Sequence, residues 1–156
     1  MNKILTYCIS MLIFSGCYQS KFEFQISNCI KISVKGFSID ESLPEDGTLR
    51  IISNDGRATI KVVCQTNSKS ELESSIDEQL NFLHSFYSPV NIDKPLIEND
   101  FTTIYFQFNR GHGMVLLSSL NENTTIIMRY TESEDNGSTR QMQKIVADIH
   151  QSIQQI

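Results

Sequence analysis

"FTTIYFQFNRGHGMVLLSSLNENTTIIMRYT", residues 101–131, contains three apolar runs separated by two polar interruptions. The runs are rich in Ile, Val, Thr, Tyr and Phe, which favour strands. The interruptions, residues 109–113 and 121–123, contain the Asn and Gly residues that tolerate turn backbone. Strands joined by turns this short pair antiparallel. The stretch therefore predicts a three-stranded antiparallel meander over residues 101–108, 114–120 and 124–131.

Residues 48–64 predict a β-hairpin upstream of the meander. Two β-branched runs flank residues 54–56, where Asn-Asp-Gly supplies the positive φ that a tight hairpin turn requires. Alternating apolar side chains over residues 22–26 and 29–34 indicate two earlier strands. Residues 40–47 ("DESLPEDG") are polar and include a proline and a glycine, so we expect a loop there.

Two further segments, residues 70–87 and 138–156, predict amphipathic helices. Each begins with a serine followed three residues later by Glu or Gln, the spacing of a capping box. Each also repeats apolar residues at intervals of three and four, which places them on one face of a helix. The apolar stripes are Leu72, Ile76, Leu80, Phe82, Leu83, Phe86 and Tyr87 in the first helix and Met142, Ile145, Val146, Ile149, Ile153 and Ile156 in the second.

Antiparallel strands and one-sided helices together predict an α+β fold, in which an antiparallel β-sheet is covered by the two helices. The order of hairpin, capped helix, meander and a last helix ending in "IHQSI" (residues 149–153) resembles the Mog1/PsbP-like α/β sandwich. Bacterial members of that family include DcrB-like lipoproteins and the chaperones of type VI secretion effectors. The resemblance covers about residues 22–156 as a single α+β domain. It implies no catalytic residues, because the fold shares none.

The first 17 residues predict export and lipid attachment. Lys3 precedes an uncharged apolar run that is too short to cross a bilayer, as in a signal peptide. Phe14-Ser15-Gly16-Cys17 resembles a bacterial lipobox. The resemblance implies that residues 1–16 are a lipoprotein signal peptide, that Cys17 carries the lipid and that residues 17–21 form a lipidated tether. The alternative is a signal-anchor helix with an incidental cysteine.

The residue after Cys17 suggests which membrane holds the protein. Tyr18, rather than Asp, favours the outer membrane under the sorting rule of enteric bacteria, with the domain facing the periplasm. The inner membrane is the alternative. Two or three acyl chains on one cysteine bind firmly, because each buried methylene contributes roughly 0.8 kcal/mol and a single chain binds only marginally.

Two cysteines remain once Cys8 leaves with the signal peptide and Cys17 is acylated. An even remainder in an oxidising compartment predicts a disulfide between Cys29 and Cys64. Two free buried thiols are the alternative. A metal site is not expected, because the pair lacks both CxxC spacing and a neighbouring histidine.

Composition argues against several classes of function. The net charge is -5, with no basic tract, so the electrostatic attraction that dominates nucleic-acid binding is missing. His84, His112 and His150 fit no catalytic or metal-binding spacing, and neither a nucleophile elbow nor a phosphate loop is present. We therefore expect no enzyme, no cofactor and no metal.

Two loops contain groups that could bind an ion. Residues 109–113 ("NRGHG") could bind an anion through backbone N–H groups and Arg110, but an ordinary hairpin is the stronger expectation. The acidic residues Glu132, Glu134 and Asp135 lack the ligand spacing of an EF-hand, so a solvated loop is expected there.

The sequence leaves three hypotheses for function. The first is a lipid-anchored, non-enzymatic binding lipoprotein of the bacterial cell envelope that recognises a protein or an envelope component, held to the membrane through Cys17. The second is an immunity protein that neutralises a secreted, type VI-like toxin, whose basic cleft could meet the acidic residues 40–46 and 132–135. The third is an enzyme, which no visible constellation supports. We expect a monomer.

Overall fold

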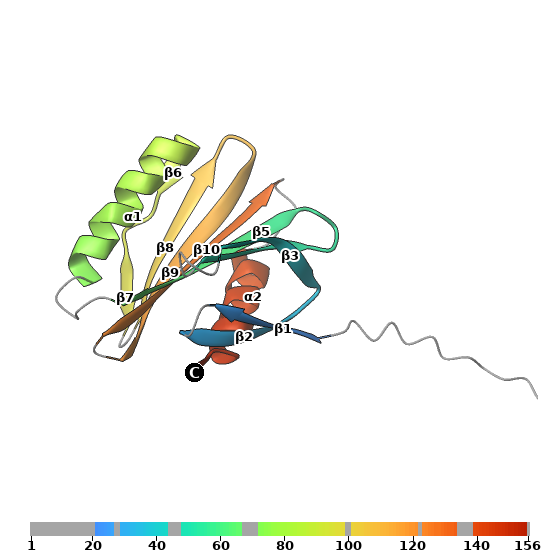
Figure 1. Cartoon of the computed structure of the whole chain (residues 1–156). Helices are drawn as coiled ribbons and strands as arrows, with labels where there is room; N and C mark the ends of the chain where they lie inside the picture. The colour runs from blue at the N-terminus through green and yellow to red at the C-terminus, as the bar shows by residue number, and fades with distance from the viewer. Residues whose placement is uncertain are drawn as a thin grey trace, which may run out of the picture.

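Two antiparallel sheets and two helices make up the fold, which confirms the predicted α+β class (Figure 1). Figure 1 shows the larger sheet in the middle, with α1 against one face and α2 with the smaller sheet against the other. The computed structural model describes residues 21–26, 29–43, 48–66, 72–98, 101–121, 123–133 and 139–155.

The larger sheet has eight strands in the order β3-β4-β5-β10-β9-β8-β6, and β7 also pairs with β8. The predicted meander lies within it, since β8, β9 and β10 are consecutive in sequence and neighbours in the sheet. The predicted hairpin joins β4 to β5 through a turn in which Gly56 has a φ of 72°. The strands are β3 Phe37–Leu43, β4 Thr48–Ser53, β5 Ala58–Thr66, β6 Asn91–Ile92, β7 Leu96–Glu98, β8 Phe101–Phe108, β9 Gly111–Asn121 and β10 Thr124–Ser133.

The smaller sheet contains the first and last strands of the described chain. β1 (Lys21–Ile26) and β2 (Ile30–Lys35) form a hairpin, and β11 (Gln154–Gln155) pairs with the other edge of β2. Lys21, the last residue of the tether expected at residues 17–21, lies in β1, and residues 17–20 lie outside the described residues.

The two helices cover opposite faces of the larger sheet. α1 (Leu72–Tyr87) places Leu83 against Val115 and Leu117, whereas α2 (Thr139–Gln151) places its own apolar residues in a separate core with the smaller sheet. α1 ends because Ser88 adopts a left-handed φ of 43° and Pro89 has no N–H to continue the helix. No described helix has both the length and the apolar character needed to span a membrane.

The central strands contain consecutive apolar residues because each of their faces is buried in one of the two cores. In β10, Ile126 and Met128 point towards α2, and Ile127 between them packs in the core of α1. Side chains alternate between the faces of a strand, so a strand buried on both faces is apolar at every position.

The second helix is shorter than predicted. The sequence pattern extends the helix to residue 156, but α2 ends at Gln151. The N–H of Ser152 donates a hydrogen bond to the carbonyl of Ile149, and the Ser152 hydroxyl donates to the same carbonyl at 2.7 Å. Bonds between residues three apart close the last turn of a helix. Ile153 still packs against the core after the helix has ended.

The loop expected at residues 40–47 is also partly wrong. β3 extends to Leu43 and pairs with β4, so the first half of this polar segment is strand, and residues 44–47 lie outside the described residues. β3 is an edge strand with one paired neighbour, and polar side chains are usual at such an edge. Asp40 forms an ion pair with Arg50, whose Nε lies 2.8 Å from Oδ2 of the carboxylate. The serines of both predicted helix caps lie outside the described residues.

Candidate functional site

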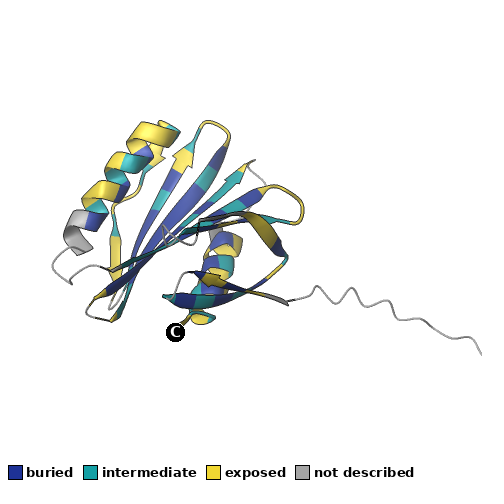
Figure 2. Cartoon of the chain, in the orientation of Figure 1, coloured by how far each residue is buried: buried dark blue, intermediate teal, exposed yellow. Residues whose placement is uncertain are grey.

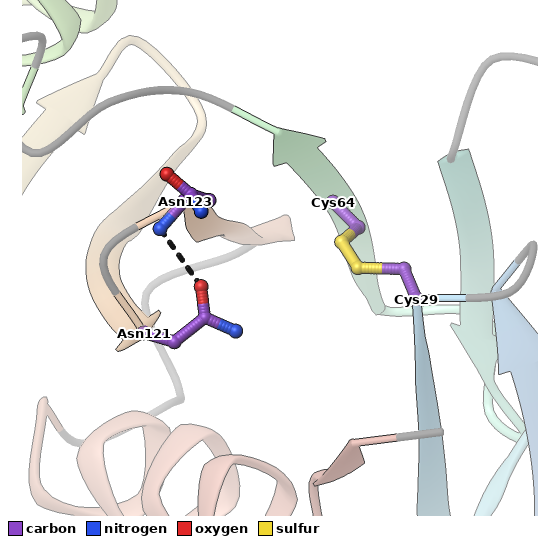
Figure 3. Close-up of a disulfide and its surroundings, with 4 residues drawn as sticks. All are labelled: Cys29, Cys64, Asn121 and Asn123. Carbon is purple, nitrogen blue, oxygen red and sulfur yellow. Dashed lines mark hydrogen bonds between the residues drawn. A yellow bond between two sulfur atoms is a disulfide. The ribbon is translucent and has the colours of Figure 1, made fainter.

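The structure describes the two cysteines of the predicted disulfide but not the predicted lipidation residue. Cys17 lies outside the described residues. Cys29 and Cys64 are joined by a disulfide, with their Cα atoms 6.5 Å apart (Figure 3). Cys29 immediately precedes β2, and Cys64 lies in β5. The disulfide therefore links the hairpin of the smaller sheet to the interior of the larger one.

The glycines of "NRGHG" have a packing role. The turn contains only Asn109 and Arg110, because β9 already begins at Gly111. The rings of Phe108 and Phe106 lie over Gly111 and Gly113, their cross-strand partners. A Cβ added to Gly113 would lie 2.6 Å from the carbonyl oxygen of Tyr130 as well as meeting the Phe106 ring.

A polar cluster lies beneath the start of α2, on the face of the sheet opposite these rings. His112 and Glu132 face each other across β9 and β10, with Nε2 and Oε2 3.6 Å apart. The hydroxyl of Tyr130 donates to the same carboxylate at 2.9 Å. Burial, and then the hydrogen bond to Glu132, raise the pKa of Tyr130 far above its usual range. The phenol therefore stays protonated, which makes it a hydrogen-bond donor and not a nucleophile.

Two cavities open beside this cluster. One, of about 560 Å³, is lined by His112, Tyr105 and Asp93 among others. The other, of about 250 Å³, is lined by Glu132 and Asp55 together with Arg57, Gln141 and other residues. These groups can donate and accept hydrogen bonds, but the described residues contain no group of three or more His, Cys, Asp or Glu placed to hold a metal ion. Glu134 and Asp135 lie outside the described residues.

The other two histidines are apart from the cluster. His84 is exposed on α1. His150 lies near the end of α2, where its Nε2 is 2.8 Å from the hydroxyl oxygen of Ser118, and burial lowers its pKa. The structure does not bring the three histidines together.

Large apolar side chains are exposed beside α1, which the sequence pattern did not predict. We define the apolar strip as Phe86, Val90, Leu96 and Ile97. Their exposed fractions are 73%, 75%, 49% and 69%. Figure 2 shows exposed residues along the outer side of α1 and the neighbouring β7 edge. Phe86 was expected to widen the buried stripe of the helix, and its exposure corrects that prediction.

Phe86, at one end of the apolar strip, is supported by a second aromatic ring. The rings of Phe86 and Phe82 are stacked with centroids 4.4 Å apart. The guanidinium of Arg129 lies 4.0 Å from the centroid of Phe82, and its Nε donates to Gln79 at 2.7 Å. Cation–π contact and a charge-assisted hydrogen bond thus fix Phe82 beneath Phe86.

The backbone next to the strip is protected from pairing with another chain. β6 and β7 are two and three residues long, and Asp93, Lys94 and Pro95 separate them. Short edge strands interrupted by lysine and proline discourage edge-to-edge pairing. The backbone of this edge is therefore poorly suited to adding a further strand.

Comparison with known proteins informs the fold alone. No protein-family model and no curated protein matches the sequence. A crystal structure of a protein from Bacteroides thetaiotaomicron VPI-5482 is similar, with a TM-score of 0.52 and 12% sequence identity. The match covers 88% of this chain and 49% of the other, so this chain spans about half the length of that protein.

Proposed function

We propose that this protein is a lipid-anchored, non-enzymatic binding lipoprotein of the bacterial cell envelope, held at the outer membrane by Cys17, and that it recognises a protein through the apolar strip. The observation that carries the proposal is the exposure of Phe86, Val90, Leu96 and Ile97 beside one helix. These are four of the five large apolar residues that are exposed in the described part of the chain. Leu96 and Ile97 are neighbours in β7 and point to opposite faces of that strand, and Val90 lies nearer the other end of β8. Scattered exposed apolar residues are ordinary, but four that follow one edge of the larger sheet and the end of α1 indicate an interaction surface.

Phe86 has the properties of an anchor residue. Its ring is exposed but already stacked on Phe82, which Arg129 holds from beneath. A side chain positioned before binding loses less conformational entropy when a partner covers it. Aromatic residues also dominate the energetics of protein interfaces.

Carboxylates around the strip favour a partner with a basic surface. Asp77 and Glu78 are exposed on α1, and Asp93 and Glu98 flank the strip residues along the chain, where Lys94 is the one exposed cation among the described residues 86–98. Complementary charge steers association and selects partners. This acidic rim is also the observation that favours the narrower role, an immunity protein that covers a basic toxin.

The Mog1/PsbP-like assignment, including its DcrB-like members, is the finer fold that we propose. Supporting it are the antiparallel sheet with a helix on each face and the order of hairpin, helix, meander and helix. A non-enzymatic role is supported by the protonated Tyr130 phenol and by the internal hydrogen bond that occupies the Glu132 carboxylate.

The anchor is tested by labelling cells with palmitate. Cys17→Ser should leave an uncleaved precursor without label, because only this cysteine can carry the lipid. Unchanged labelling of the variant would rule out the anchor.

The binding surface is tested by affinity capture from envelope extracts with Phe86→Ser and Ile97→Ser. Ile39→Ser is the matched control, because Ile39 is 53% exposed on the opposite edge of the sheet. We expect the two strip variants to lose a partner that the wild type and the control both retain, while all melt alike, since exposed substitutions change stability by about 0.5 kcal/mol or less. Equal capture by the strip variants and the control would remove the strip from the proposal.

A further inference from the structure

Three parts of the described chain meet at the end of the fold where the chain emerges from residues 17–20. Lys21 pairs with Lys35 at the end of the β1–β2 hairpin. The N–H of Asn54 then donates to the carbonyl of Gly36 at 3.0 Å, which places the β4–β5 turn beside Lys35. We call this the tether end of the domain.

The β8–β9 turn and the start of α2 lie at the same end. Ser133 donates to the carbonyl of Arg57 and pairs with Gly111, which directly follows Asn109 and Arg110. Gln141, in the first turn of α2, lines a cavity together with Asp55 and Gly36. The tether end therefore carries the exposed cations Lys35, Arg57, Arg110 and Arg140.

These four cations have no ion pair within 4 Å among the described residues. Of the nearby acids, Asp55 and Glu132 accept hydrogen bonds from within the domain, whereas Asp148 is exposed and lines a cavity with Lys35. The carboxylate of Asp55 accepts hydrogen bonds from Ser53 and from the N–H of Arg57, which hold its pKa below the usual range. The Glu132 carboxylate accepts a hydrogen bond from the hydroxyl of Tyr130. The four cations are consequently free of ion pairs with the described residues and can contact an outside anion, although Arg57 also interacts electrostatically with the exposed carboxylate of Asp55.

The length of chain before β1 keeps this end close to the acyl chains that we propose on Cys17. An extended chain spans at most about 3.6 Å per residue, so Cys17 and Lys21 can be no more than about 14 Å apart. Electrostatic attraction to a charged surface extends over about 8 Å at physiological ionic strength. The tether thus holds the cations within or just beyond the reach of phospholipid head groups.

We propose that the tether end docks on the anionic phospholipid surface of the membrane that anchors the protein, with Lys35, Arg57, Arg110 and Arg140 facing the head groups. The proposal rests on the lipid anchor at Cys17. Each cation near an anionic membrane strengthens binding about fivefold. The disulfide and the β9–β10 turn then face away from the membrane, and the apolar strip stands along the side of the domain.

The test uses the full lipidated protein in vesicles of phosphatidylethanolamine with about a quarter phosphatidylglycerol. Asn109→Cys at the tether end, or Asn123→Cys in the β9–β10 turn at the opposite end of β10, provides one free thiol for a fluorophore, because the remaining cysteines are acylated or disulfide-bonded under the proposal. Head-group nitroxide lipids should quench the label at residue 109 and leave the label at residue 123 bright. Added salt and pure phosphatidylcholine vesicles should both weaken the quenching.

Charge reversal makes the test specific. Arg57→Glu with Arg110→Glu should lower the ratio of docked to undocked domain by about 25-fold or more. The single reversal Lys94→Glu, compared with Arg110→Glu alone, makes the same change in net charge at an exposed position between β6 and β7 and should leave the ratio unchanged. Equal quenching at residues 109 and 123 in vesicle-bound protein, or insensitivity to the Arg57 and Arg110 reversal, would overturn the docking. Failure of the wild type to float with vesicles would instead overturn the anchor itself.

Discussion

The two faces of the eight-stranded sheet are covered to very different extents. Among the residues whose burial the structure describes, the face of α2 carries a core of nineteen, to which the smaller sheet and the helix both contribute, whereas the core beneath α1 has six. The disulfide also belongs to the larger core, because Cys29 and Cys64 both pack against it. All four residues of the apolar strip lie along α1 or the strands next to it.

The unequal cores show how the two faces of one sheet can have different roles. Burial of apolar area is the main source of stability, so the face of α2 supplies most of it. The face of α1 needs only enough packing to seat its helix, and its periphery can then expose apolar residues without threatening the fold. Under the proposed function, stability and recognition thereby lie on opposite sides of the same strands.

The largest expected effect is loss of the disulfide on the side of α2. It closes a loop with a sequence separation of 35 residues. Cys29→Ala with Cys64→Ala should lower the free energy of unfolding by about 4 kcal/mol on the loop-entropy model. Denaturant unfolding of the oxidised domain measures the difference. If the two forms are equally stable, the hairpin of the smaller sheet is held by packing alone.

The next largest effect is a cavity in the same core. Ile149 is 3% exposed on α2, and Ile149→Ala should cost about 2 to 5 kcal/mol through lost burial and incomplete repacking. Lys144→Ala, at an exposed position of the same helix, is the control and should change little. A variant at Ile149 that melts like the wild type but loses a binding partner would make α2 the interaction surface and reverse the comparison.

A smaller cost is expected from overpacking the core of α1. Gly113→Ala brings a methyl group against the Phe106 ring and the Tyr130 carbonyl, and the backbone cannot move as a flexible side chain would. We expect about 1 to 3 kcal/mol of destabilisation. Gly56→Ala is the comparison at a site with open space, where only the positive φ opposes the substitution. Equal stability of Gly113→Ala and wild type would mean that the rings do not require the glycine.

The smallest expected effect is a pH dependence from His150. Burial lowers the pKa of its imidazole below about 6.5, the value for an unfolded chain, so the unfolded state binds the proton more readily. The free energy of unfolding should therefore fall as pH drops below about 6.5, until the folded-state pKa is passed. Comparing urea unfolding of wild type and His150→Gln at about pH 7 and pH 5 isolates this contribution. An identical pH dependence in both proteins would assign it to other groups.

Long periodic elements could be predicted from the sequence, because their patterns repeat over many residues. The meander at β8, β9 and β10 and the hairpin at Gly56 are such cases. β6, β7 and β11 were missed because two or three residues carry no measurable period. The end of α2 was missed because the Ser152 side chain closes the helix, although the apolar spacing continues to Ile153.

The candidate site was harder to predict for a different reason. Phe86 has the helical spacing of a buried residue, and only the position of α1 over the sheet leaves it uncovered. Leu96 and Ile97 follow Lys94 and Pro95 in a segment without a clear pattern. The pairing of His112 with Glu132 depends on the register of β9 and β10, which turn chemistry alone does not specify.

The disulfide also determines how the domain would bear mechanical force. If Cys17 is anchored as proposed, a pull on that end acts first on Lys21, at the end of β1, which is an edge strand paired only with β2 among the described strands. The bonds of that pair would break one after another, starting at Lys35, so β1 should peel away under low load. Beyond Ile26 the force meets Cys29 and passes through its sulfur into Cys64 in β5. The covalent link thus carries tension from the membrane directly into the middle of the larger sheet, and the chain from residue 30 to residue 63 is shielded from it.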